Sequence, residues 1–196
     1  IGQRTSGASD AALDRALAEG SILRTHVLRP TWHFVLPEDI RWMLELTGPR
    51  VHTVNGPYYR QFELPSDILA SSGSVVAAAL EGGQQLTRKD IATLLERAGV
   101  RAAGPRLAYI LMYAELNMLV CSGALRGKEH TYALFDERVP AQISFTREEA
   151  LARLTELHFT GHGPATSRDF RWWSGLTAPD VKHGLALVGE RLDRRS

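Results

Sequence analysis

Residues 119–135 read LVCSGALRGKEHTYALF, and the fold class depends on how this stretch is interpreted. Apolar and β-branched residues stand at both ends, and a segment rich in glycine and charge, Gly123 to Lys128, separates them. This pattern predicts a β-hairpin with strands at about Leu119 to Ser122 and Thr131 to Phe135. The segments on either side can be assigned by their distance from this hairpin.

Three helices are predicted before the hairpin. The first spans about 66–80, the second begins at Thr87 and ends at Gly99, and the third opens at Pro105. Asp90 follows Thr87 by three residues, a spacing at which each side chain satisfies a free backbone amide of the other residue. Three helices followed by a hairpin, with a short turn between the second and third, is the order of a winged helix-turn-helix unit.

Residues 66–140 are therefore predicted to form one complete winged-helix unit, and the order recurs at 141–196. In the later copy Thr146, Thr166 and Thr177 each precede an acidic residue by three positions and predict helix starts. The first two helix starts have nearly the same spacing in both copies, which indicates an internal repeat. The alternative is chance similarity between short helices. No hairpin follows in the later copy, so we expect three helices without a wing.

A further partial copy, the third helix and wing of a unit, is predicted at residues 1–35. A helix from about Ser9 to Glu19 leads into a hairpin through Ile22 to Val35, with its turn at Arg29-Pro30-Thr31. Together the segments predict a mainly α fold with small β-hairpins (α+β), built from tandem winged helix-turn-helix units. We expect the first and last units to be incomplete.

Residues 36–65 are predicted to form a helical connector between the first two units. One helix is expected from Pro37 to Leu46, and Gly48-Pro49 and Gly56-Pro57 are expected to interrupt the rest of the connector.

Composition narrows the functional classes. Lys and Arg number 23 and Asp and Glu 22, so no strong overall field attracts nucleic acid, and any such contact must be local. The single Cys121 excludes an internal disulfide and a cysteine zinc cluster, and we expect a buried thiol in a reducing compartment. No apolar run is long enough to span a membrane and no secretory leader is visible, so we expect a cytoplasmic, nucleoid-associated protein without a membrane partner.

DNA contacts in the complete unit are expected at two places. The third helix of such a unit enters the major groove, and the hairpin tip lies on phosphates or in a minor groove. Arg101 and Arg106 stand at the start of the third helix, and Arg126, Lys128 and His130 surround the tip. We therefore predict these five residues to be DNA-binding; the alternative is a solvated charged loop.

The hairpin at Ile22 to Val35 also carries candidate DNA-binding residues. Strand alternation places Arg24 and His26 on one face, and Arg29, Thr31 and His33 lie around and beyond the turn. Arginine and histidine on one hairpin favour contact with phosphate, with ordinary hydrogen-bonded structure as the alternative. Metal ligation is disfavoured because no carboxylate or cysteine stands at a ligand spacing from the histidines.

The later copy has an aromatic cluster. Phe170, Trp172 and Trp173 cannot all face one way on a helix, so one tryptophan is expected to be exposed or to lie at a contact between units. Stacking on an unpaired base is the alternative to packing. Arg168 and, more weakly, Lys182 are candidate phosphate contacts.

Two longer stretches resemble a known family. Residues 21–35 (SILRTHVLRPTWHFV) and 161–176 (GHGPATSRDFRWWSGL) are similar to those of the bacterial winged-helix DNA-binding domain proteins related to AlkZ. The resemblance extends to residues 126–128 and 131–134 and covers nearly the whole chain. It implies tandem winged helices acting on double-stranded DNA, in some members as a glycosylase that removes alkylated bases or unhooks interstrand crosslinks.

The resemblance assigns no catalytic residue within this chain. Glycosidic bond cleavage needs a positioned water and stabilisation of a cationic sugar, which the family assigns to a Gln-aliphatic-Gln motif. We expect this motif upstream of Ile1, because Gln61 stands alone and Gln84 and Gln85 are adjacent. No metal or other cofactor is expected. Two alternatives remain: a non-catalytic DNA-binding or regulatory protein, and a scaffold whose units bind protein.

Overall fold

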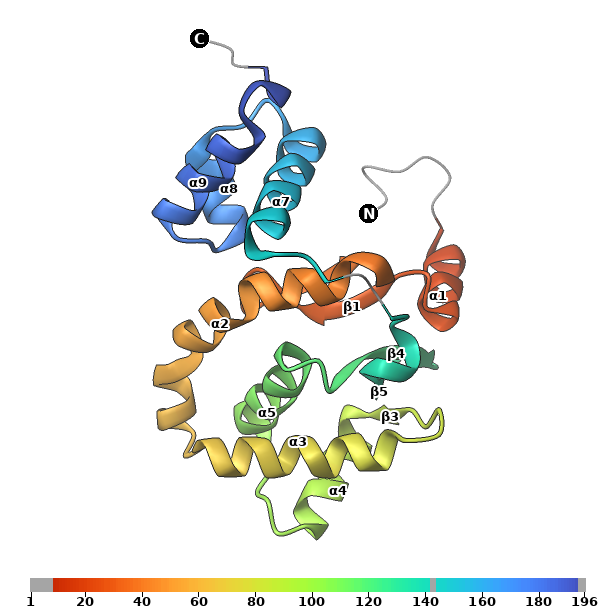
Figure 1. The fold of residues 1–196 in the computed structure, drawn as a ribbon. Coiled ribbons are helices and arrows are strands. Elements are labelled where there is room, and N and C mark those ends of the chain that lie inside the picture. Colours follow the sequence, from red (N-terminus) through yellow and green to blue (C-terminus); the bar gives the residue numbers. More distant parts are fainter. Residues whose placement is uncertain (1–8, 142–143, 194–196) are drawn as a thin grey trace.

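The structure is a computed structural model that describes residues 9–141 and 144–193. The other residues, which belong to the predicted units at 1–35 and 141–196, lie outside the described part of the chain. The helices and strands (Figure 1) occur in the order α1 (Asp10–Glu19), β1 (Leu23–His26), β2 (Trp32–Val35), α2 (Pro37–Gln61), α3 (Ser66–Leu80), β3 (Leu86–Thr87), α4 (Arg88–Arg97), α5 (Gly104–Leu116), β4 (Val120–Arg126), β5 (Glu129–Leu134), α6 (Phe135–Arg138), α7 (Arg147–His162), α8 (Ser167–Ser174), α9 (Ala178–Val188) and the 3-10 helix η1 (Gly189–Arg191). The predicted fold class, mainly α with small antiparallel sheets, is confirmed.

The predicted helix starts are confirmed by their capping contacts. The hydroxyls of Thr87, Thr146 and Thr166 each accept a hydrogen bond from the backbone amide three residues on, and the acidic residue at that position accepts from the threonine amide. The hydroxyl of Thr177 accepts from the Asp180 amide in the same way. Each contact satisfies amides that the first turn of a helix leaves free.

The hairpin from β4 to β5 is longer and tighter than predicted. Its strands extend from Val120 to Arg126 and from Glu129 to Leu134, so only Gly127 and Lys128 form the turn. We call this turn the hairpin tip. The two-residue strand β3 pairs with β5 in the order β3-β5-β4 and was not predicted, since two residues show no alternation. Phe135 begins the short helix α6 instead of ending the strand.

The connector helix was predicted to end at Leu46, and this was wrong. Helix α2 continues to Gln61 with Pro49 and Pro57 inside it. The continuation is held by tertiary contacts, because Val51 and Asn55 on this part of α2 are buried and the Asn55 amide donates to the Met112 sulfur of α5 at 3.0 Å. Packing outweighs the local cost of the prolines here.

The described residues form two hydrophobic cores. One core joins the β1–β2 hairpin, which we call the front hairpin, to the first half of α2 and to the C-terminal helices α7, α8 and α9. The other lies in the middle unit, which we define as α3 to β5, together with Leu64 just before α3. Neither core tests the predicted boundaries between the winged-helix units, so these boundaries stay a prediction.

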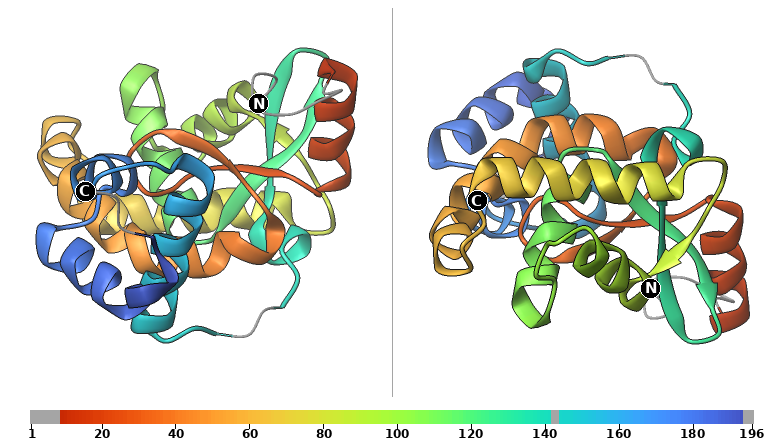
Figure 2. Two further views of the ribbon diagram at one scale, coloured as in Figure 1. Left: turned by 90° about the horizontal axis from the view of Figure 1, so that it is seen from above. Right: turned by 90° about the horizontal axis from the view of Figure 1, so that it is seen from below.

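Helix α5 lies inside the arc formed by α2 and α3, while α7, α8 and α9 gather at one end of the molecule and α4 lies at the other (Figure 1). Helix α1 lies beside the β4–β5 hairpin (Figure 2). The Arg138 guanidinium donates to the carbonyls of Leu17, at 2.5 Å, and Ala18 at the end of α1. Within the described part of the chain, no helix combines the length and the apolar character needed to cross a bilayer.

Candidate nucleic-acid interface

Arg101, just before α5, and Arg106, in its first turn, both contact other parts of the protein. Arg101 pairs with the Glu63 carboxylate at 2.7 Å. Arg106 donates to the carbonyls of Arg101 at 2.8 Å, of Phe62, and of Glu63 at 2.7 Å. These bonds fasten the turn between α2 and α3, so Arg106 in particular has little freedom to reach DNA.

Helix α5 is covered on the side that a groove-reading helix would expose. Its Tyr109 stacks on Tyr58 of α2 at 5.2 Å between ring centroids, and Tyr113 lies 5.3 Å from the His52 ring. The buried residues of α5 are Leu107, Ile110, Leu111, Met112, Ala114, Glu115 and Leu116. Helix α2 covers the side of α5 that carries Tyr109 and Tyr113. This geometry does not fit the expectation that the third helix faces DNA.

The hairpin tip carries an exposed lysine and is preceded by a fixed arginine, the last residue of β4. Arg126 pairs with Asp90 at 2.8 Å and donates to the Gln85 carbonyl at 2.6 Å, which braces the tip against the start of α4. Lys128 is exposed and has no side-chain partner among the residues that the structure describes. His130 is exposed beside it, and desolvation, with a smaller effect from the charge of Arg24, lowers the pKa of His130.

The first strand of the front hairpin is buried, in contrast to the expected exposed face. Arg24 and His26 have relative exposures of 8% and 7%. His26 contacts the buried Glu115 of α5, and the Arg24 guanidinium lies 4.3 Å from the centroid of the Trp32 ring. Desolvation lowers the pKa of Arg24. His26 therefore joins the hairpin to α5, while Arg24 packs within the hairpin on Trp32, and both side chains are withdrawn from the surface.

The turn of the front hairpin is more accessible. Thr31 is exposed, and its carbonyl lies 3.0 Å from Nδ1 of His33, whose pKa is lowered chiefly by burial. Arg29 is half-buried and its guanidinium lies 4.3 Å from the centroid of the Trp172 ring.

The prediction that one tryptophan of the aromatic cluster is exposed or at a contact is confirmed. Trp172 is 71% exposed and contacts Arg29 of the front hairpin.

The C-terminal helices bring cations together. Arg168 and Arg171 of α8 and Lys182 of α9 line one pocket of about 580 Å³. The sequence patterns missed Arg171. Its spacing of three residues from Arg168, which places both on one side of a helix, was the signal that could have identified it.

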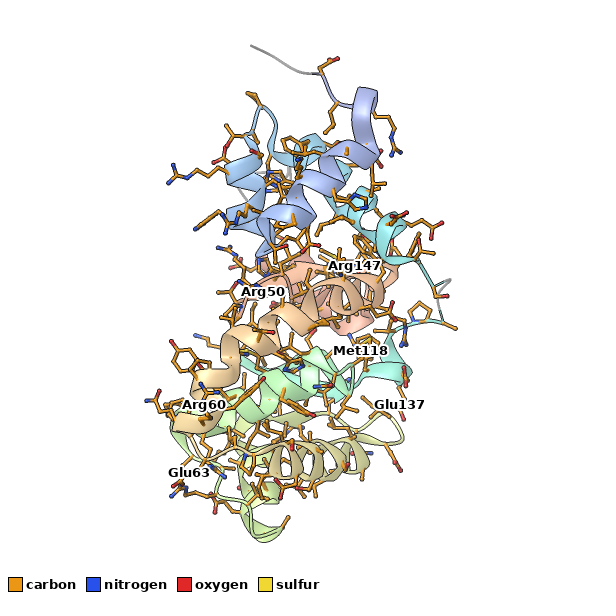
Figure 3. All side chains as sticks on the ribbon, turned by 60° about the vertical axis from the view of Figure 1, so that its left-hand side comes forward. Arg50, Arg60, Glu63, Met118, Glu137 and Arg147 are labelled. Carbon is orange, nitrogen blue, oxygen red and sulfur yellow. The ribbon has the colours of Figure 1, made fainter. Side chains whose placement is uncertain are left out.

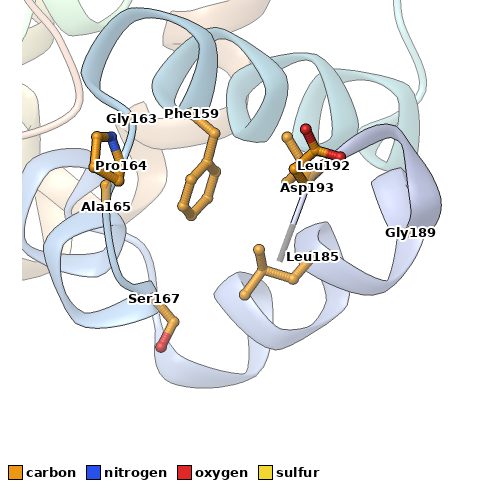
Figure 4. Close-up of a pocket in the computed structure, with 9 residues that line it drawn as sticks. All are labelled: Phe159, Gly163, Pro164, Ala165, Ser167, Leu185, Gly189, Leu192 and Asp193. Atoms are coloured by element: carbon orange, nitrogen blue, oxygen red, sulfur yellow. The ribbon is translucent and has the colours of Figure 1, made fainter. Parts of the chain in front are cut away.

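A neighbouring pocket of about 590 Å³ has a different character (Figure 4). Phe159, Pro164, Leu185 and Leu192 make its wall largely apolar, and Asp193 supplies a negative charge. It therefore does not suit phosphate.

The glutamines considered in the sequence have structural or exposed positions. Gln85 has a structural role, since its side-chain oxygen accepts from the Ala124 amide at 2.7 Å. Gln61 is exposed at the end of α2, as are Arg50 and Arg60 along the same helix (Figure 3). In the part of the chain described, no three His, Cys, Asp or Glu side chains are grouped to hold a metal.

The single cysteine is buried, as predicted. Burial raises the pKa of the Cys121 thiol to about 12.

Comparison with known proteins gives one match to a solved structure and one to a family model. A search of curated proteins found no match. Among solved structures, the chain resembles Streptomyces sahachiroi DNA glycosylase AlkZ with a TM-score of 0.75 and 21% identity, over 96% of this chain and 53% of that chain. The chain thus spans about half the length of the structure it matches. The model of the family described as DNA glycosylase AlkZ-like matches residues 1–194, so the chain belongs to the AlkZ-like DNA glycosylase family.

Proposed function

We propose that this chain binds double-stranded DNA through winged-helix units as part of a DNA glycosylase that excises alkylated bases or unhooks interstrand crosslinks. The observation that carries the proposal is the family match over residues 1–194. The catalytic step belongs to the full-length protein, with the Gln-aliphatic-Gln motif supplied by residues outside this chain. A chromosomal DNA substrate would place the protein in the cytoplasm, at the nucleoid.

The geometry supports DNA contact at fewer residues than the sequence suggested. Lys128 at the hairpin tip is an exposed cation braced from behind by Arg126, so it can reach a phosphate without loss of an internal contact. Arg24 and His26 are buried, Arg106 is bound to backbone carbonyls, and Arg101 shares an exposed ion pair with Glu63, so none of the four is an unpaired exposed cation.

Binding is tested with full-length protein and a labelled duplex, by fluorescence anisotropy at several salt concentrations. We expect affinity to fall linearly with salt on a log–log plot, because phosphate contacts release counterions. Lys128→Gln should lower this slope by about 1, the value for one phosphate contact. Lys89→Gln, an exposed lysine on α4, is the matched control and should change nothing. A wild-type affinity that does not depend on salt would contradict phosphate binding.

Catalysis is tested by abasic-site formation on duplexes that carry alkylated bases or an interstrand crosslink. We expect the full-length protein to produce abasic sites, or unhooked strands, on at least one of these substrates and none on the undamaged duplex. Binding without either product would favour the alternative, a non-catalytic DNA-binding or regulatory protein.

A further inference from the structure

Helices α8 and α9 are joined in the manner of a helix-turn-helix. Helix α8 ends at Ser174 and α9 begins at Ala178, so the turn consists of residues 175–177. Gly175 adopts a left-handed conformation, with φ of 69°, that ends α8 and redirects the chain. A turn of this length containing glycine is typical of helix-turn-helix motifs.

The outer side of this motif is basic. The pocket between the two helices has Arg168, Arg171 and Lys182 in its wall, and no acid is among the described residues that line it. All three cations are exposed and have no ion-pair partner in the described part of the chain.

The acids on these two helices, Asp169 and Asp180, have contacts of their own. Asp169 accepts hydrogen bonds from the amide, at 2.8 Å, and the hydroxyl, at 2.7 Å, of Thr166. Asp180 pairs with Arg147 at 2.8 Å.

Asp169 offsets part of the charge of Arg168, because the pKa of Asp169 is lowered by its hydrogen bonds with Thr166 and, to a smaller extent, by the Arg168 charge. Arg171 and Lys182 have no ionic partner among the described residues. The pocket therefore keeps an excess of positive charge and suits an anionic partner.

The basic surface continues beyond the pocket. Trp172 lies one turn after Arg168 on α8, so the two side chains share a face of the helix. The ring of Trp172 carries the Arg29 guanidinium on one side and is 71% exposed. This stacked pair links the pocket to the turn of the front hairpin.

The middle unit offers no equivalent surface. Its third helix, α5, is covered by α2, and Arg106 at its start is bound to backbone carbonyls. In contrast, Lys182, His183 and Ala186 on α9 are exposed, and α9 packs on its inner side against α7 and α8.

We propose that α8 and α9 form the helix-turn-helix that docks on duplex DNA, with Arg168, Arg171 and Lys182 bound to backbone phosphates. This deepens the proposed function and rests on it, because it names the surface that receives the duplex. In a helix-turn-helix the first helix crosses the backbone and the second enters the major groove. The two arginines of α8 therefore meet phosphates, which their planar, multidentate guanidinium groups suit, and Lys182 lies where the groove begins.

The test uses the full-length protein and the triple variant Arg168→Gln/Arg171→Gln/Lys182→Gln. We expect duplex affinity at moderate salt to fall by about ten- to several-hundred-fold, and the log–log salt slope to decrease by about 3. The triple variant Arg60→Gln/Lys89→Gln/Arg97→Gln removes the same charge from exposed residues at the opposite end of the molecule and should leave both values unchanged. Arg168→Lys/Arg171→Lys/Lys182→Arg, which keeps the charge, should retain most of the affinity.

Three other outcomes are informative. Unchanged affinity and slope in the first triple variant, with salt-dependent binding by the wild type, would overturn the docking surface and leave the proposed function intact. An equal loss in both neutral triple variants would also overturn it, since the effect would then come from net charge. A wild-type protein that binds no duplex at any salt concentration would overturn the proposed function itself. Thermal unfolding of each variant verifies that the fold is kept.

Discussion

The contact between His26 and Glu115 is the most deeply buried ionisable pair of the described residues and joins the front hairpin to α5. Their side chains are 9% and 1% exposed. Loss of one partner of a buried pair leaves the other without compensation and is far more costly than loss of a surface pair.

We therefore expect Glu115→Gln to lower the free energy of unfolding by about 3 kcal/mol. Glu63→Gln is the matched control, because Glu63 and its partner Arg101 are 76% and 67% exposed. That change should cost no more than about 1 kcal/mol. Urea unfolding measures both, and equal costs would show that the buried contact adds nothing beyond a surface pair.

The buried side chain of His158 should make the free energy of unfolding fall in weak acid. It is 2% exposed, packs against Phe170 and Trp173, and has no hydrogen-bond partner for either ring nitrogen among the described residues. Desolvation, with the neighbouring His162, lowers its pKa to about 4, while Asp169 acts in the opposite direction. Between about 6.5 and 4 the unfolded chain holds a proton that the folded chain lacks, so the stabilisation is complete above the ordinary pKa and is lost as the pH falls.

We expect wild type to lose up to about 3 kcal/mol more than His158→Phe between pH 7 and pH 4.5, as measured by denaturant unfolding at each pH. Phenylalanine keeps an aromatic ring at this position and cannot titrate, so the difference between the two proteins isolates His158. Parallel pH profiles would contradict the assignment.

The same scale explains which site residues the sequence could predict. Exposure of one tryptophan followed from the adjacency of Trp172 and Trp173 on a single helix. The partners of Arg106 did not, because the carbonyls of Phe62 and Glu63 lie more than forty positions away and meet it only in the folded chain. Local patterns identify charges, whereas tertiary contacts determine which charges remain free.

At the scale of elements, the sequence predicted helix starts better than helix ends. The threonine caps are local and survive in the fold, since both partners lie within one turn. The end of α2 was predicted wrongly because the Gly-Pro pairs near Pro49 and Pro57 read as interruptions, while burial against α5 keeps the helix intact. Strand β3 exists only through its pairing with β5, a contact with no local signal.

The turn between α8 and α9 gives a prediction at this scale. A Cβ atom at Gly175 would lie 2.4 Å from the Leu28 carbonyl oxygen of the front hairpin, and its φ is 69°. We expect Gly175→Ala to cost about 3 kcal/mol, from backbone strain and from displacement of the hairpin. Gly99→Ala is the control, because Gly99 has a φ of 79° and open space around it, and should cost about 1 kcal/mol. Equal losses for the two variants in thermal or urea unfolding would mean that the front hairpin moves away from the added methyl group at no cost in stability.

At the scale of the whole molecule, one core connects the front hairpin to the C-terminal helices, and Arg29 stacks on Trp172 between them. The sequence could predict the helix starts but not this arrangement, because the residues that form the core come from segments far apart in the chain. The strands that carry the hairpin tip contribute Val120 and Tyr132 to the other core, and Arg126 beside the tip is paired with Asp90. The molecule therefore offers DNA two candidate contact surfaces that share no side-chain partner.

Two surfaces without shared partners should contribute independently to the affinity for one duplex. We expect the loss of binding free energy in a protein that combines Lys128→Gln with the neutral triple variant of α8 and α9 to equal the sum of the separate losses to within about 0.5 kcal/mol. Fluorescence anisotropy on one labelled duplex at fixed salt measures all three. If the combined variant binds as well as the triple variant alone, the hairpin tip does not touch the duplex held by α8 and α9, since removal of a real phosphate contact must weaken binding whatever else has been lost. A loss well beyond the sum would instead mean that the two surfaces are coupled, because each would then depend on the other to hold the DNA in place.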